Sequence, residues 1–432
     1  MATPAYNLIN ELKWRGMLQD IMPGTEDLLK KEMVKGYIGF DPTSDSLGVG
    51  NLVQIMTLLH FQQAGHKPYA LVGGATGMVG DPSGKSEERN LLSKEVLNHN
   101  LACQKKQLEK FLDFECGDNS AEIVNNYDWF KDMLLLDFLR NIGKNITISY
   151  MMAKDSVKNR IAGEDEEGMS FTEFTYQLIQ GYDFYYLWKH HGIKMQMGGS
   201  DQWGNIVTGT KLIRRKDKGE AFAYTTPLIT KADGTKFGKT ESGNLWLDPN
   251  RTSPYRFYQF WLKASDTDIK NYIRIFTLFK EDEIITLEKM HDAEPHLRYL
   301  QKALAKDITI RVHSQKDLDR AIETSSILFG SVFEDFKKLT AEEIESAFDE
   351  NETKRFSKSV FESDVGPISL LGEHTNIYAS KGEAKRAIQG NAVSINKQKI
   401  KLETKSGKAD LLYDKFLLVQ KGKSDYYLLI AE

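Results

Sequence analysis

Residues 36–72 read GYIGFDPTSDSLGVGNLVQIMTLLHFQQAGHKPYALV, and this stretch decides the fold. Its two ends, GYIGF at 36–40 and PYALV at 68–72, are short apolar runs bounded by Gly and Pro, as in buried strands of a parallel sheet. Between them, residues 51–64 carry apolar side chains at helical spacing, and Gly65 favours the end of a helix. A strand, a helix and a second strand in this order predict an open, doubly wound, mostly parallel α/β sheet.

The remaining segments predict further parts of the chain. A helix over 171–190 followed by a strand over 193–197 extends the sheet, and the pattern after Pro254 is helical. The acidic stretch 342–352 is typical of a linker, and short strands are predicted near the end of the chain, in VSIN and DYYLLI. We expect an α/β domain at 1–245, an α-helical domain at 246–335, a linker at 336–360 and a small α+β domain at 361–432.

The composition is that of a soluble, multidomain globular protein. The chain has 432 residues, of which 41% are hydrophobic and 27% charged. No apolar run is long enough to cross a membrane and the first residues do not resemble a signal peptide, so we expect a cytoplasmic protein. Cys103 and Cys116 are too few and too far apart for a disulfide framework or a cysteine zinc site. We expect no tightly bound metal.

Charge is distributed unevenly along the chain. The net charge is -4, yet residues 376–432 contain eleven Lys or Arg against six Asp or Glu. A basic module on an acidic body is typical of an enzyme that meets a nucleic acid at one place. A lysine-rich solvated surface explains the same pattern equally well.

Two glycine-rich segments follow the predicted strands, where ligands bind in open parallel sheets. DPTSDSLGVGN (41–51) joins a strand to a helix start, a place that favours phosphate, although such turns are also common without a ligand. GGATGMVGDPSGKS (73–86) resembles a phosphate-binding P-loop, but its glycine spacing is one residue too short. It is either a polar loop without a ligand or a loop that carries Asp81, Lys85 and Arg89 over a substrate.

The stretch SFTEFTYQLIQGYDFYYLW (170–188) predicts a buried helix with a polar stripe. Ser170 and Glu173 form a capping box that begins the helix. The stripe itself lies at i, i+4 and i+7, and the remaining faces are apolar, so its polar groups need partners; a solvated face is the alternative. Its members are Tyr176, Gln180 and Asp183, and we expect Gln196, Asp201 and Gln202 after the next strand to face the same crevice.

KADGTKFGKT (231–240) places three lysines among glycines. It is either a surface hairpin or a flexible loop that closes positive charge on a polyphosphate, with Gly234 and Gly238 as hinges.

Together the strings YIGFDPTSDSL, ALVGGATGMVGDPSGK, SFTEFTYQLIQGYD, QMGGSDQWGN and KFGKT resemble the bacterial tyrosyl-tRNA synthetases, a family of class I aminoacyl-tRNA synthetases. The match runs from about Tyr37 to Thr240, and SKGEAKRAIQGNAVSIN near the end resembles the family's small RNA-binding domain. The resemblance implies a Rossmann-like catalytic domain, an anticodon-side helical domain and an RNA-binding domain. It also implies L-tyrosine, ATP with Mg²⁺ and tRNA(Tyr) as substrates, and a homodimer.

The same resemblance implies roles for individual residues. The substrate phenol would be held by Tyr37 and Asp183, and its ammonium group by Asp81, Tyr176 and Gln180. The tyrosine carboxylate and the ribose and adenine side of ATP would be positioned by Gln196, Asp41, Asp201 and Gln202, with Gly39, Gly48 and Gly50 at the ATP site. The residues expected to serve the phosphates and catalysis are Thr43, Asn51, Lys236, Lys239 and Thr240. The residues expected to bind RNA are Lys381, Lys385 and Arg386.

One position departs from the family pattern. The family's HIGH signature stands here as Gly48-Val49-Gly50-Asn51, so no side chain is present where a histidine usually meets the departing phosphates. Another group compensates, or the activation step is slow, or the chain was altered at this position. Two alternatives stay open at this point: the tryptophan enzyme of the same class, and a catalytically weakened RNA-binding scaffold.

Overall fold

The computed structural model describes residues 7–81, 92–154, 157–158, 169–235, 237–240, 243–330, 332–362, 365–422 and 425–432. The chain divides into two compact units. The first consists of Met1–Gly238, Trp246–Asp248 and Lys263–Val312, and the second of Lys239–Leu245, Pro249–Leu262 and His313–Glu432. Among the described helices, none combines the length and the apolar character that a membrane span needs.

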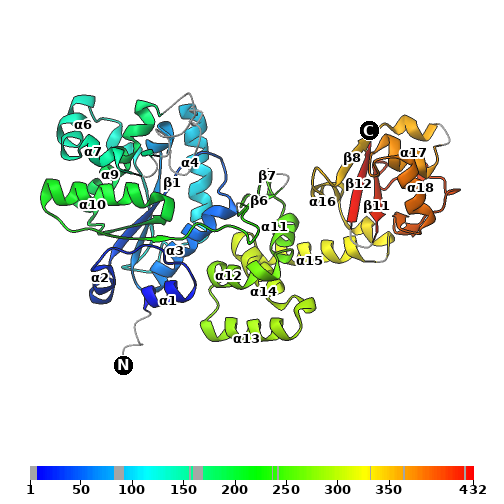
Figure 1. Ribbon diagram of the computed structural model, residues 1–432, viewed down its shortest axis with the longest axis horizontal. Helices are drawn as coiled ribbons and strands as arrows, with labels where there is room; N and C mark the ends of the chain where they lie inside the picture. Colours follow the sequence, from blue (N-terminus) through cyan, green and yellow to red (C-terminus); the bar gives the residue numbers. More distant parts are fainter. Residues whose placement is uncertain are drawn as a thin grey trace. The chain divides into compact units, whose positions relative to one another are not determined.

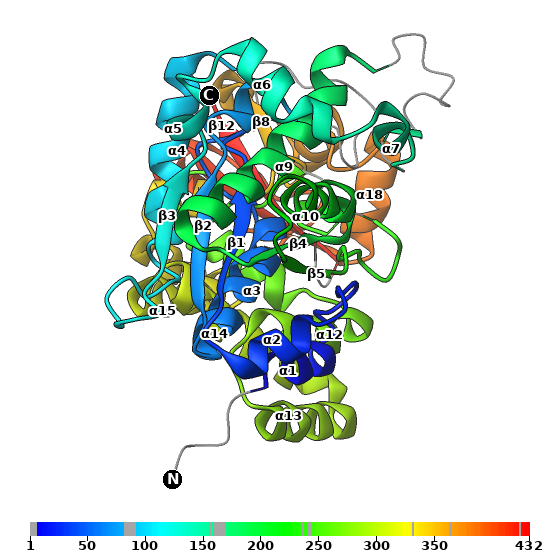
Figure 2. The same cartoon turned by 90° about the vertical axis from the view of Figure 1, so that its left-hand side faces the viewer.

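The first unit is built on a five-stranded sheet in the order β3-β2-β1-β4-β5. Every pairing within it is parallel, and helices cover both of its faces (Figures 1 and 2). The predicted open, mostly parallel α/β sheet is therefore confirmed. The strands are β1 (Lys35–Phe40), β2 (Lys67–Val72), β3 (Glu122–Asn125), β4 (Met195–Gly199) and β5 (Phe222–Thr226).

The helix between β1 and β2 is α3 (Leu52–Gln63), preceded by one 3₁₀ turn, η1 (Val49–Asn51). Gly65 follows it with φ +82°, a left-handed conformation that favours glycine. The other helical elements of this unit are α1 (Leu8–Trp14), α2 (Thr25–Lys31), η2 (Thr76–Met78), α4 (Lys94–Leu108), α5 (Tyr127–Phe130), α6 (Leu135–Asn141), η3 (Gly143–Asn145), α7 (Ile148–Met152), α9 (Phe171–His191), η4 (Ser200–Gln202), α10 (Trp203–Asp217), α12 (Asp266–Phe276), α13 (Glu281–Ala293), η5 (Pro295–Leu297) and α14 (Tyr299–Val312).

Two close contacts join helical elements within this unit. Helices α9 and α10 pack closely because Gly209 has no side chain: a Cβ atom there would lie 2.8 Å from Cβ of Phe184. Arg15, only 2% exposed, donates to the backbone carbonyls of Arg274 and Thr277 at 2.6 and 2.9 Å. A buried guanidinium with these partners satisfies carbonyl groups that the end of α12 leaves unpaired.

The second unit contains helices and a five-stranded sheet in the order β10-β9-β11-β12-β8. Its strands are β8 (Thr353–Phe356), β9 (Val393–Ile395), β10 (Gln398–Lys399), β11 (Phe416–Lys421) and β12 (Asp425–Ala431), with a small hairpin of β6 (Lys239–Thr240) and β7 (Gly243–Asn244). Its helical elements are α11 (Pro254–Leu262), α15 (Gln315–Phe329), η6 (Glu334–Lys338), α16 (Ala341–Ser346), η7 (Lys358–Glu362), α17 (Pro367–Ser369), a π turn η8 (Leu370–His374), α18 (Lys381–Gln389) and η9 (Lys408–Asp410). The chain is helical after Pro254 and has strands near its end, as predicted, but helices α12, α13 and α14 of the predicted helical part belong to the first unit.

Residues 336–360, which we expected to form a linker, are folded. They include α16 and β8, and β8 pairs in parallel with β12 at the edge of the sheet. Two of the acidic side chains that suggested a linker have basic partners distant in sequence: Glu345 accepts from Lys415 at 2.6 Å, and Glu343 pairs with Arg320. The domain boundaries themselves stay predictions.

Candidate active site

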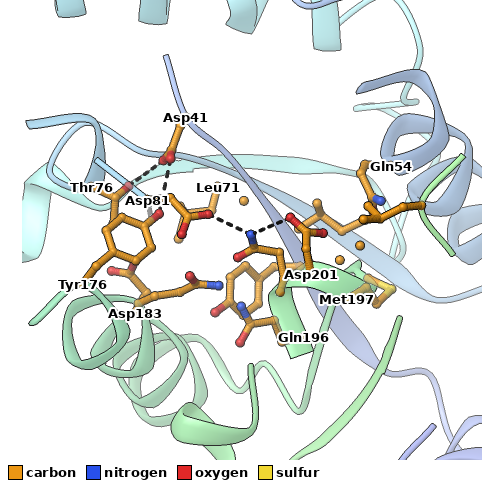
Figure 3. Close-up of a pocket in the computed structure, with 18 residues that line it drawn as sticks. Asp41, Gln54, Leu71, Thr76, Asp81, Tyr176, Asp183, Gln196, Met197 and Asp201 are labelled. Atoms are coloured by element: carbon orange, nitrogen blue, oxygen red, sulfur yellow. Dashed lines mark hydrogen bonds between the residues drawn. The ribbon is translucent and has the colours of Figure 1, made fainter. Parts of the chain in front are cut away.

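A polar pocket of about 200 Å³ lies at the carboxyl ends of β1 and β4 (Figure 3). This is where an open parallel sheet binds its ligands. Many of the predicted site residues meet there although they come from distant parts of the chain. Those that line it are Tyr37, Gly39, Asp41, Asp81, Tyr176, Gln180, Asp183, Gln196, Asp201 and Gln202.

Strand register and one helix position the side chains of the pocket. Tyr37 of β1 lies beside Gln196 of β4 in the parallel ladder, so both can face the same side of the sheet. Gln196 is inside β4, which begins at Met195, two residues later than predicted. Helix α9 begins at the predicted capping box of Ser170 and Glu173, and its polar stripe faces the pocket.

Asp183 is the most enclosed acid of the pocket, with 1% of its surface exposed. Its Oδ1 accepts from Nε1 of Trp129 at 2.8 Å, and its Oδ2 accepts from Nδ2 of Asn126 at 3.1 Å. Burial raises the pKa of this carboxyl to about 8; the two hydrogen bonds act in the opposite direction, and the charge of Asp41 adds to the rise. The carboxyl group is thus fixed in orientation and sensitive to pH near neutrality.

Several polar atoms of the pocket lack a hydrogen-bond partner among the described residues. They are the hydroxyl of Tyr37 and the Oε1 atoms of Gln54, Gln180 and Gln196. An unpaired buried polar group is costly, and native proteins rarely keep one without a ligand or water. Burial also raises the pKa of Tyr37 well above its usual value, so its hydroxyl stays a hydrogen-bond donor. The pocket therefore fits a ligand with hydrogen-bonding groups of its own.

A network of acids forms the other side of the pocket (Figure 3). Asp41 accepts from Thr76 Oγ1 at 2.9 Å and from the hydroxyl of Tyr176 at 3.3 Å. Asp81 accepts from Nε2 of Gln202 at 2.7 Å. None of the described lining residues is Lys, Arg or His. The resulting negative potential favours a cationic group such as an ammonium.

The residues predicted for the phosphate side are not among those that line this pocket in the described chain. Gly48, Gly50 and Asn51 lie at the start of α3, where the N–H of Gly48 donates to Oδ1 of Asn51 at 3.0 Å. The exposed Thr43 lies just after the end of β1. Lys85, Arg89 and Lys236 fall outside the described residues, as do the side chains of Lys239 and Thr240.

Four hydrogen-bonding residues of the site escaped the sequence analysis. Gln54 and Thr76 line the pocket. Asn126 and Trp129 are not among its lining residues but donate hydrogen bonds to the carboxyl group of Asp183. A signal for the last two was present in EIVNNYDWF, where polar and aromatic residues follow a short apolar run. In the described part of the chain, no group of three or more His, Cys, Asp or Glu could hold a metal ion.

Family models match almost the whole chain. Residues 29–330 match the family described as tRNA synthetases class I (W and Y). The chain belongs to this family. Residues 343–429 match the SYY-like C-terminal domain of tyrosine–tRNA ligases, which places this synthetase in the tyrosine branch.

Similar proteins agree with this placement. The synthetase is 57% identical to the tyrosine–tRNA ligase of Bacteroides thetaiotaomicron over 429 residues, covering 99% of this chain and 100% of the relative. It is 58% identical to that of Cytophaga hutchinsonii over 426 residues, covering 98% and 99%. A C-terminally truncated mitochondrial tyrosyl-tRNA synthetase of Aspergillus nidulans superposes with a TM-score of 0.65 at 31% identity, covering 73% of this chain and 92% of that structure. The predicted family is confirmed, and the scaffold alternative is not favoured.

Proposed function

We propose that this synthetase activates L-tyrosine with ATP and then transfers the tyrosyl group to tRNA(Tyr). The observation that carries the proposal is the buried pair of Tyr37 and Asp183, whose hydroxyl and carboxyl groups lie inside a pocket of about 200 Å³. A phenol can accept from Tyr37 and donate to Asp183 at once, which satisfies the unpaired hydroxyl. An indole has a single N–H and no acceptor, so it would leave Tyr37 unpaired.

The opposite end of tyrosine meets the acidic network. In our proposal its ammonium group binds Asp81, Tyr176 and Gln180, where charge-assisted hydrogen bonds are strong. Its carboxylate then lies toward Gln196, Asp201 and Gln202, beside the ribose of ATP. These assignments are supported by the position of the side chains around one pocket, with Gly39 allowing close approach of the nucleotide.

The chemical step needs no nucleophile from the protein. A carboxylate oxygen of tyrosine attacks the α-phosphorus of ATP, the bond to the β-phosphate oxygen breaks, and pyrophosphate leaves with that bonding pair. We assign Thr43, Lys236 and Lys239 to the departing phosphates by resemblance to the family. Groups placed there in advance stabilise charge that grows only in the transition state. ATP would enter as its Mg²⁺ complex, and we propose no resident metal.

The acceptor of the second step is tRNA. Lys381, Lys385 and Arg386 lie on α18 and are exposed, so they can meet phosphates of a folded RNA. The 2′ or 3′ hydroxyl of the terminal ribose would attack the tyrosyl carbonyl, with AMP as the leaving group. Because these substrates are those of translation, we place the protein in the cytoplasm.

We also propose a homodimer. The first unit exposes a group of large apolar side chains along α6, α7 and the start of α9, and an exposed group of this kind marks an association surface. The apolar patch consists of Leu134, Leu135, Leu136, Leu139, Ile148, Met152 and Phe171, with exposed fractions from 39% to 76%. The occupant we propose is the same patch of a second copy, because a closed dimer buries identical surfaces against each other.

The experiment that tests the activity is exchange of labelled pyrophosphate into ATP. Exchange should depend on L-tyrosine and be absent with L-tryptophan or without an amino acid. Exchange with tryptophan would assign the protein to the other branch. A chain that binds tRNA(Tyr) but shows no exchange with any amino acid would be a scaffold and would overturn the proposal.

A further inference from the structure

Helix α4, cyan in Figure 1, presents a row of buried amide side chains to the loop after β1. Asn100, Gln104 and Gln107 lie at i, i+4 and i+7, so they share one face of the helix. Their exposed fractions are 4%, 2% and 8%, although amide side chains are mostly exposed in proteins. Burial of three amides in one row requires partners for all three.

Two of these amides fix the backbone on each side of Thr43. Nδ2 of Asn100 donates to the carbonyl of Pro42 at 2.9 Å, and Nε2 of Gln104 donates to the carbonyl of Ser44 at 2.9 Å. Thr43 itself is exposed. The residue assigned to the phosphates is therefore held between two anchored carbonyl groups while its own side chain stays accessible.

The third amide fixes the end of the loop. Oε1 of Gln107 accepts from the backbone N–H of Leu47 at 2.8 Å, and its Nε2 donates to Oγ of Ser46 at 3.1 Å. Leu47 directly precedes Gly48, where the family signature begins. The side chain of Gln107 thus fixes the backbone of Leu47, directly before Gly48 and the 3₁₀ turn η1.

The loop has no strand or helix to satisfy its backbone groups. Buried carbonyl and N–H groups outside regular structure need side-chain partners, and α4 supplies them at Pro42, Ser44 and Leu47. At the other end of the loop, Asp41 is held by Thr76 and lines the tyrosine pocket. The loop consequently joins the amino acid pocket to the phosphate side of the proposed site.

We infer that the amide row of Asn100, Gln104 and Gln107 is a positioning device that holds residues 42–47 in the conformation that binds ATP. This inference rests on the proposed function. These residues touch neither substrate; they act through Thr43 and through the backbone before Gly48. They should therefore affect ATP much more than tyrosine.

The principal test substitutes Gln104 by Leu, which keeps similar volume and removes the bond to the carbonyl of Ser44 at 2.9 Å and a longer one to the carbonyl of Asp41 at 3.4 Å. We expect kcat/KM for ATP in pyrophosphate exchange to fall about five- to tenfold, mainly through loss of the shorter bond to Ser44. Tyrosine binding measured by equilibrium dialysis should be unchanged, because the Asp41 side chain keeps its bonds from Thr76 and Tyr176. Asn98→Ala is the matched control, because Asn98 is an exposed amide on the same helix. Equal losses for ATP and tyrosine would overturn the inference, since they would indicate general damage to the unit.

A double-mutant cycle with Thr43→Ala tests the route of the effect. If Gln104 acts through Thr43, the two losses should be clearly less than additive; full additivity would contradict the inference.

Hydrogen exchange of the peptide 41–50 gives a readout that needs no activity. Gln107→Leu should speed its exchange while Asn98→Ala should not, and unchanged exchange would refute the positioning role. Absence of pyrophosphate exchange in the unaltered chain, by contrast, would refute only the proposed function.

Discussion

Nε1 of Trp129 donates to Oδ1 of Asp183 across 2.8 Å, which sets the direction of the carboxyl group before any substrate arrives. Trp129 is in turn stacked on Tyr186, with ring centroids 4.6 Å apart, so its indole has little freedom to turn. Nδ2 of Asn126 donates to the second carboxyl oxygen, Oδ2. A phenol that enters the pocket therefore meets an acceptor whose geometry is already fixed, which lowers the entropic cost of binding.

The stability of the free protein should depend on the protonation of Asp183. Burial raises the pKa of this carboxyl to about 8 from an ordinary value of 3.8, so between these values the native protein holds a proton that the unfolded chain has lost. The free energy of unfolding should fall as pH rises through this range, by at most about 1.4 kcal/mol per pH unit. The asparagine of Asp183→Asn does not titrate, so its contribution to stability does not change with pH. The difference in thermal midpoint, variant minus parent, should therefore increase between pH 5 and pH 8. Parallel pH profiles would contradict the prediction.

Selectivity against phenylalanine should follow from the same pair. Phenylalanine leaves both Tyr37 and Asp183 without the phenol, and discrimination of about 10⁴ to 10⁵ is the figure established for this family of enzymes rather than one obtained from the geometry. Tyr37→Phe removes one of the two bonds and should reduce the ratio of kcat/KM values by about two- to tenfold. Pyrophosphate exchange with both amino acids measures the ratio. If the parent activates tyrosine and phenylalanine at comparable rates, Tyr37 and Asp183 do not recognise the phenol.

The features of the site that lie within one helix could be predicted from the sequence. The residues that hold Asp183 in place, Asn126 and Trp129, could not. The capping box at Ser170 and the stripe that contains Asp183 depend on spacing within one helix, which the sequence shows directly. The bond from Trp129 to Asp183 joins residues 54 positions apart. Trp129 follows β3, a partly buried edge strand that contains Glu122 and lacks a clear apolar pattern. Contacts of this kind arise from the tertiary fold.

The acidic segment shows the same limit. A run of carboxylates usually indicates a solvated segment. Here Glu345 pairs with Lys415, 70 positions away, and β8 pairs with β12. Charge patterns report composition, whereas the partners that neutralise the charges lie elsewhere in the chain.

Binding of tRNA should depend on the basic face of α18. Replacing Lys381, Lys385 and Arg386 together by Ala should reduce tRNA charging, flatten its salt dependence by about one unit per lost phosphate contact, and leave pyrophosphate exchange unchanged. Lys381 pairs with Glu373, so its single substitution should cost least.

Lys337→Ala, an exposed lysine of the same unit outside α18, is the matched control for these substitutions. Deletion of 361–432 is a poorer test because it removes β12 and leaves β8 unpaired. If charging by the triple variant equals that of the parent, α18 is only a solvated surface.

The proposed homodimer should depend on the start of α6. Leu135 and Leu136 are 69% and 76% exposed and are the first two residues of that helix, where acidic side chains favour the helix dipole. Substituting both by Glu should leave the subunit folded and shift sedimentation from dimer to monomer. Met33→Glu, at an apolar residue 46% exposed outside the patch, should sediment like the parent. A parent chain that sediments as a monomer would refute the dimer itself.

Restoring a histidine at position 48 should accelerate the first step. Gly48 has φ -96° and ψ 170°, an extended conformation that any residue adopts, so histidine can enter without backbone strain. Loss of one transition-state donor costs on the order of 10² to 10³ in rate, so Gly48→His should raise kcat for pyrophosphate exchange by up to that factor if no other group compensates. The affinity for tyrosine should hardly change, because the contact is to the leaving pyrophosphate and forms mainly in the transition state.

Gly48→Ala separates the imidazole from the mere addition of a side chain, and it should leave the rate near that of the parent. An unchanged rate for Gly48→His together with a severe loss in Thr43→Ala or Lys85→Ala would show that those residues already supply the missing donor. If Thr43→Ala is the variant that loses activity, the loop anchored by α4 holds the compensating group, because Thr43 lies between the two carbonyls that Asn100 and Gln104 fix. A parent without exchange that Gly48→His fails to rescue would remove the basis for assigning activation to this site.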